Sequence, residues 1–90
     1  MGSAATTMAQ ASYTVGDHGV VAKSFRPKTK GEARDLVLKI FERNRWDERS
    51  QRVYMKNKGV TPKPLEELSI EDLRILVDAM DRSHMVIFAD

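Results

Sequence analysis

The chain has 90 residues, a formal net charge of +2 and no cysteine. This length allows one domain at most, and the lack of cysteine excludes disulfides, iron–sulfur clusters and thiolate zinc sites. No apolar run approaches the roughly 18 residues that span a bilayer, and the N-terminus lacks the basic-then-apolar order of a signal peptide. We therefore expect a soluble intracellular protein, cytoplasmic or nuclear, that is not attached to a membrane.

Residues 1–22 are rich in Gly, Ala, Ser and Thr and show no hydrophobic period. Such a segment buries too little apolar surface to offset the entropy lost on folding. We expect a disordered N-terminal arm over residues 1–22, whose opening Met1-Gly2-Ser3 is typical of an expression remnant. The folded domain is expected over residues 23–84.

The first predicted helix runs from about Lys30 to Asn44. Thr29 and Glu32 have the spacing of a capping box at its start. Leu38 lies off the main apolar stripe and widens it, so the helix is expected to contact neighbours on two sides. The stripe itself has helical spacing and consists of Ala33, Leu36, Val37, Ile40 and Phe41.

The second predicted helix begins at Asp47, whose carboxylate can cap the following amides. It ends at Gly59, which accepts a left-handed conformation. Met55 points away from its two other faces, and the helix is not expected to be central. One face is weakly apolar and consists of Trp46, Ser50, Val53, Tyr54 and Asn57. An adjacent face is basic and consists of Arg49, Arg52 and Lys56.

The third predicted helix follows a linker over residues 60–68, which two prolines hold extended. Ser69 is its N-cap, with Asp72 three residues later, and Leu68 and Leu73 occupy the positions of a hydrophobic staple. Ile75 lies off the apolar stripe and is expected to be exposed. The stripe consists of Ile70, Leu73, Leu76, Val77 and Met80.

Two β-prone runs, Val20–Ala22 and Met85–Phe88, flank the helices. They are compatible with a small terminal sheet, with flexible ends or with an edge that a partner uses. We predict an all-α fold, a small three-helix domain with short terminal strands as an option and an apolar C-terminal tail over residues 85–90. The expected core consists of Leu36, Val37, Ile40, Phe41, Trp46, Val53, Leu68, Leu73, Leu76, Val77 and Met80.

No residue pattern in the chain points to catalysis. The two histidines, His18 and His84, are far apart and near the ends, whereas metal sites and activated nucleophiles need several positioned groups. A glycine-rich phosphate loop and a calcium loop are both absent. We therefore expect a non-enzymatic protein with no catalytic residue, no metal and no cofactor.

Charge is unevenly distributed along the chain. Residues 23–63 contain thirteen basic and five acidic residues, a net of +8, whereas residues 64–90 have a net charge of −5. Clustered Lys and Arg neutralise phosphates, and Trp46 and Tyr54 could stack on bases. We predict a module that binds nucleic acid in transcription or nucleic-acid processing, although a merely solvated helix face would have the same pattern. The predicted contact residues are Arg43, Arg45, Arg49, Arg52, Lys56 and Lys58.

An alternative prediction rests on apolar residues that three short helices cannot easily bury, since exposed apolar patches mark partner surfaces. In this interpretation the chain is a protein-binding adaptor or a homo-oligomer, which uses the acidic third helix and the apolar tail. The predicted partner-binding residues are Ile75, Met85, Val86, Ile87 and Phe88.

The segment from Gly19 to Gly59 resembles the ribbon–helix–helix family in the order of its elements, a strand-like run and two helices. The glycine-containing turn of that family is replaced here by Asn44-Arg45-Trp46-Asp47. The resemblance implies a dimer that reads the DNA major groove with strand side chains such as Lys23.

Overall fold

The computed structural model describes residues 20–89, and the predicted three-helix fold is confirmed. Most of the predicted N-terminal arm lies outside the described residues, while Val21 and Ala22 already belong to the first strand. The elements in chain order are strand β1 (Val21–Ser24), helices α2 (Lys30–Arg43) and α3 (Glu48–Asn57), the short 3₁₀ helix η1 (Leu65–Glu67), helix α4 (Ile70–Arg82) and strand β2 (Val86–Phe88).

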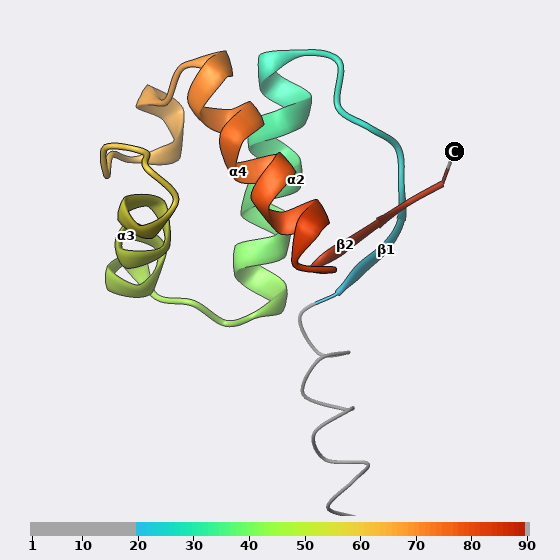
Figure 1. Ribbon diagram of the computed structural model, residues 1–90, viewed down its shortest axis with the longest axis horizontal. Coiled ribbons are helices and arrows are strands. Elements are labelled where there is room, and N and C mark those ends of the chain that lie inside the picture. The colour runs from blue at the N-terminus through green and yellow to red at the C-terminus, as the bar shows by residue number, and fades with distance from the viewer. Residues whose placement is uncertain (1–19, 90) are drawn as a thin grey trace, which may run out of the picture.

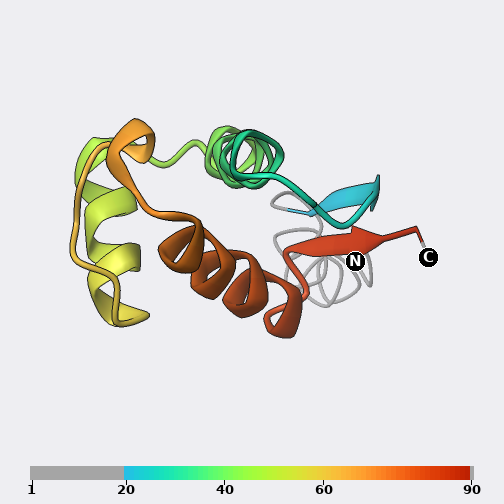
Figure 2. The ribbon, with the colours of Figure 1, turned by 90° about the horizontal axis from the view of Figure 1, so that it is seen from above.

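Helices α2 and α4 pack side by side and form the centre of the described structure (Figure 1). Helix α3 flanks this pair on one side and the two strands flank it on the other, as the view from above shows (Figure 2). The basic helix and the sheet therefore occupy opposite ends of the fold.

The two strands pair in parallel, with Val21 opposite Val86 and Ser24 opposite Phe88. The Val21 N–H donates to the Met85 carbonyl (3.0 Å) and the Ala89 N–H donates to the Ser24 carbonyl (2.8 Å). Parallel strands need a long crossover, and here all three helices provide it. The ribbon–helix–helix resemblance ends at this point, because a further helix and a second strand complete the sheet within one chain.

All three helices begin at the caps that the sequence predicts. The Thr29 hydroxyl accepts from the Glu32 N–H (3.1 Å) while the Glu32 carboxylate accepts from the Thr29 N–H (3.2 Å), which is a complete capping box. Asp47 and Ser69 each accept a hydrogen bond from the N–H three residues later, at 2.8 and 3.1 Å. Short-range hydrogen bonds therefore fix where each helix starts.

All three helices also end in the same backbone motif, the Schellman motif. Its characteristic bond joins an N–H to the carbonyl five residues earlier, and it links Trp46 to Phe41, Val60 to Met55 and Met85 to Met80, at 3.1, 2.9 and 2.8 Å. Each of these bonds also brings two large apolar residues together. The residue directly before each N–H donor has a positive φ: Arg45 (56°), Gly59 (84°) and His84 (59°).

The core contains the expected residues of α2 and α4, together with Leu68, all of which are buried. Two expectations for α3 are wrong: Val53 is 51% exposed, and Met55, expected to point away from the fold, is only 1% exposed. The 60–68 linker also contributes to the core, through Val60 and Leu65. The reason lies at the end of α3, where the Schellman motif turns Met55 and Val60 into the same apolar cluster.

Candidate nucleic-acid interface

Helix α3 is held to the fold by its two ends. At its start, the side chain of Gln51 donates to the Trp46 carbonyl (3.0 Å), and Trp46 packs against the core. At its far end, Met55 is inserted into the core beside Val60. This attachment leaves the outer side of α3 free of other described elements (Figure 1).

The face that the sequence predicts as apolar is open rather than buried. It forms a shallow hollow of about 350 Å³ that is lined by Trp46, Arg49, Ser50, Val53, Tyr54 and Asn57. Five of these six residues are the predicted face, and Arg49 joins it from the basic side. The predicted set of residues therefore does share one surface, which is open to solvent while Trp46 and Tyr54 pack against the core beneath it.

Three aromatic rings form the floor and support of this hollow. The ring centroids of Trp46 and Tyr54 are 5.0 Å apart, and Phe41 lies behind them at 5.6 Å from Trp46 and 6.3 Å from Tyr54. Contacts at these distances favour tilted or edge-on rings, as observed here. Phe41 is fully buried, so the two half-buried rings rest on a rigid base.

The polar end of Tyr54 is inside the protein. Its hydroxyl is buried without a hydrogen-bond partner among the described residues. Burial raises the pKa of the Tyr54 hydroxyl, while the nearby positive charge of Arg82 opposes that shift. Tyr54 is therefore neutral at physiological pH, and its ring, together with the amine of Lys58 5.4 Å above it, is what the surface presents.

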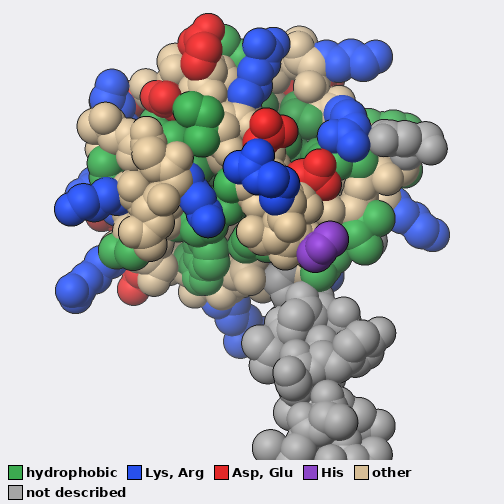
Figure 3. All heavy atoms as spheres, viewed as in Figure 1, with side chains coloured by type: hydrophobic (Ala, Val, Ile, Leu, Met, Phe, Trp, Pro, Cys, Tyr) green, Lys and Arg blue, Asp and Glu red, His purple; other side chains and the backbone are tan. Residues whose placement is uncertain are grey.

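The basic residues of α3 lie exposed beside the hollow. Arg52 makes an ion pair with Glu48 (3.8 Å), whereas no acidic side chain in the described part of the chain lies within ion-pair distance of Arg49 or Lys56. The charge of Arg49 still acts locally, because it helps the Ser50 N–H to lower the pKa of the Asp47 carboxyl. Lys and Arg side chains project from the side of the molecule on which α3 lies (Figure 3).

The other predicted contact residues are placed less uniformly. Arg45 is exposed at the turn between α2 and α3, next to Trp46 in the chain. Arg43 instead donates to the Val20 carbonyl (3.3 Å), so it tethers the chain just before β1. The structure thus brings five of the six predicted residues to α3 and its two ends, and places Arg43 at the end of α2 with a contact to the strand side.

The predicted partner-binding residues divide into two groups. Ile75 on α4 is 41% exposed and Ile87 on β2 is 54% exposed. Val86 is buried, and Met85 and Phe88 are half-buried against the core. Most of the apolar side chains of residues 85–88 are thus covered by the packing of the sheet against the core.

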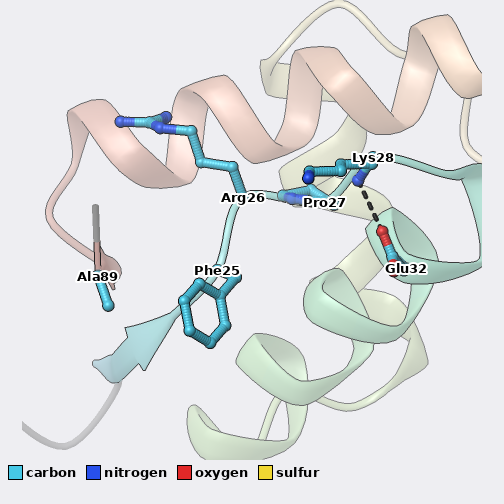
Figure 4. Close-up of a pocket in the computed structure, with 6 residues that line it drawn as sticks. All are labelled: Phe25, Arg26, Pro27, Lys28, Glu32 and Ala89. Carbon is cyan, nitrogen blue, oxygen red and sulfur yellow. Dashed lines mark hydrogen bonds between the residues drawn. The ribbon is translucent and has the colours of Figure 1, made fainter.

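A second hollow, of about 630 Å³, lies beside the segment that links β1 to α2. Phe25, 80% exposed, and Arg26 point to opposite sides of this segment (Figure 4). The guanidinium of Arg26 lies 4.4 Å from the centre of the Phe88 ring and 3.7 Å from the Asp81 carboxylate. Of the two cations that line this hollow, Arg26 and Lys28, Arg26 is therefore already engaged within the fold.

Within residues 20–89 no group of three or more His, Asp or Glu side chains could hold a metal ion. The described helices also include none that is long and apolar enough to cross a membrane. Comparisons with protein-family models, with curated proteins and with solved structures found no match to this chain.

The sequence contained a signal for the buried side of α3. Gly59 predicts a Schellman ending, and that motif brings an apolar residue just after the glycine onto the residue five positions earlier. Applied to Val60, this rule selects Met55 as the buried residue of α3. In the structure the same motif pairs Phe41 with Trp46, although its left-handed residue is Arg45 rather than a glycine, so the sequence contained no such signal there.

Proposed function

We propose that this protein binds nucleic acid through the surface of α3, with Arg49, Arg52 and Lys56 on the phosphates and Trp46 and Tyr54 beside the bases. The observation that carries the proposal is the continuity of the exposed basic stripe with an open aromatic hollow, since Arg49 belongs to both. Phosphate contacts supply sequence-independent affinity, and aromatic faces add stacking to any base.

The side chain of Arg45 extends the same surface. Arg45 adopts a left-handed conformation at φ 56°, where a residue with a side chain is less stable than glycine by about 1 kcal/mol. Lys23 and His84 have similar φ values, 58° and 59°, elsewhere in the fold, so the position of the Arg45 side chain and not its φ is what bears on the surface. At this turn an arginine extends the basic stripe past Trp46, which a glycine would not do.

The test compares two triple variants that remove the same charge. Arg49→Gln/Arg52→Gln/Lys56→Gln removes the stripe, and Lys23→Gln/Lys28→Gln/Lys30→Gln removes three exposed lysines at the other end of the fold. Binding of labelled single-stranded RNA, single-stranded DNA and duplex DNA is measured by fluorescence anisotropy at two salt concentrations.

We expect the α3 triple variant to lose at least about ten-fold in affinity, because it can no longer neutralise three phosphates. Each lost phosphate contact should also reduce the slope of log K against log salt by about 0.7–0.9. Three contacts therefore correspond to a slope smaller by about 2 to 3. The control triple variant should keep most of the affinity. Absence of binding, binding without salt dependence, or equal losses in both variants would contradict the proposal.

The intrinsic fluorescence of Trp46 gives an independent measurement, because it is the single tryptophan of the chain. A base that stacks in the hollow should quench this fluorescence in step with the anisotropy change. Binding that leaves the Trp46 emission unchanged would place the nucleic acid elsewhere.

A further inference from the structure

The outer edge of β2 offers unused backbone hydrogen-bonding groups. In a strand, the N–H and C=O of one residue point to the same side, and neighbouring residues alternate. Met85 and Ala89 bond to β1, so Ile87 points to β1 as well, and Val86 and Phe88 present their N–H and C=O groups to the outside. No described element lies along that edge (Figure 2).

The two edges of the sheet differ in their protection against further pairing. Strand edges are commonly blunted by lysine, by bulges and by proline. The β1 edge has two of these features: its register is irregular between Val21 and Ser24, and Lys23 within that interval is exposed with φ 58°. Strand β2 has none of them, since residues 85–89 contain no charge and no proline and the strand has ordinary negative φ values.

We propose that the outer edge of β2 pairs with β2 of a second copy of this chain, antiparallel and with the two-fold axis at Ile87. This register places Val86 opposite Phe88 of the other copy, and each such pair exchanges two N–H···O=C bonds. The two Ile87 residues face each other as the central non-hydrogen-bonded pair, in which side chains approach most closely. The two-stranded sheet becomes a four-stranded one.

A second copy fits this edge because β2 has no charged side chain that would repel the same side chain of another β2. A two-fold pairing brings every residue of β2 near its own equivalents, and any charge there would meet a like charge. Residues 85–89 carry none. The pairing also covers Ile87, whose apolar side chain is 54% exposed.

The expected dimer is weak. A three-residue strand pair covers much less than the roughly 1,200–2,000 Å² of a standard stable interface. The association should therefore depend on protein concentration, and it requires no nucleic acid. Its failure or success is thus separate from that of the α3 proposal.

A cysteine cross-link tests the register directly, because the natural chain has no cysteine. A non-hydrogen-bonded antiparallel pair has a Cα separation of about 4.5 Å, which a disulfide can span. Ile87→Cys should form a covalent dimer under mild oxidation at least about ten times faster than Ile75→Cys, whose site on α4 is similarly exposed. Equal cross-linking rates for the two variants would overturn the proposal.

Light scattering over a range of concentrations tests the association without any covalent bond. The average mass of the natural chain should rise towards that of a dimer as its concentration increases. The variant Ile87→Lys should remain monomeric, because two lysines would face each other. The control variant Ile75→Lys should behave like the natural chain. Circular dichroism checks that both variants are folded. A natural chain that stays monomeric into the millimolar range would overturn the proposal and leave the edge to a strand of another protein.

Discussion

Helices α3 and α4 are built alike at their ends and differently along their sides. Both begin at a side-chain cap and end in a Schellman motif. Helix α4 buries a continuous stripe against α2, including Leu73, Leu76 and Met80. Helix α3 has Met55 as its one buried residue, and is attached by that residue and by the aromatic contacts near its start.

This difference shows how a small domain can keep an exposed functional face. A helix that packs along its whole length has only its outer half available for a ligand. A helix that is held at its ends can present a lateral face, and on α3 that face contains both the aromatic hollow and the basic stripe. The arrangement depends on few core contacts, so each of them should be individually important.

The largest expected effect comes from the core residue of α3. Met55→Ala should lower the free energy of unfolding by about 2–5 kcal/mol, because it leaves a cavity in a tightly packed site. The matched change Val53→Ala, two residues away and half-exposed, should alter it by less than about 0.5 kcal/mol. Urea denaturation followed by circular dichroism measures both. Similar losses for the two variants would mean that α3 is attached by its outer face.

The next effect concerns the three left-handed residues that end the helices. Gly59→Ala should destabilise the protein by about 1 kcal/mol, because an alanine is strained at φ 84° even though no atom beyond its chain neighbours lies within 4 Å of the added Cβ. Arg45→Gly should stabilise it by up to about 1 kcal/mol for the opposite reason.

The variant His84→Gly is a control for Arg45→Gly and is measured by the same urea denaturation. His84→Gly at the end of α4 should stabilise the protein as Arg45→Gly does, since its φ is nearly the same. On the proposed function, Arg45→Gly also weakens nucleic-acid binding while His84→Gly leaves it unchanged. A destabilising Arg45→Gly would show that the arginine makes a compensating contact.

The smallest expected effect is a pH dependence of stability, which the Asp47 cap of α3 should show and the Ser69 cap of α4 should not. The Ser50 N–H lowers the pKa of the Asp47 carboxyl, so the ionised cap stabilises the fold above the ordinary aspartate pKa of about 3.9, and this contribution is lost as pH falls through the lowered value. The cap of α4, Ser69, does not titrate in this range. The stability difference between the natural chain and Asp47→Ser should therefore shrink from pH 7 to pH 3, as measured by thermal unfolding. A constant difference would contradict this account.

The candidate site was partly predictable. The basic stripe and its neighbouring face follow from helical spacing, and the hollow contains the predicted Trp46, Val53 and Tyr54. The orientation of that face was not predictable from spacing, because a weakly apolar face and a lone methionine compete for the core on nearly equal terms. Only the turn after Gly59 decides the outcome, by carrying Val60 back onto Met55.

The sequence by itself determined where the three helices begin and where α3 ends, because caps and Schellman motifs are hydrogen bonds between residues three to five positions apart. It also determined the buried side of α4, whose apolar stripe has no competitor on the same helix. Only the tertiary structure decided that β1 and β2 pair in parallel and that one edge of this sheet remains open. These features depend on residues such as Val21 and Val86, 65 positions apart in the chain, and no local pattern records that such residues meet.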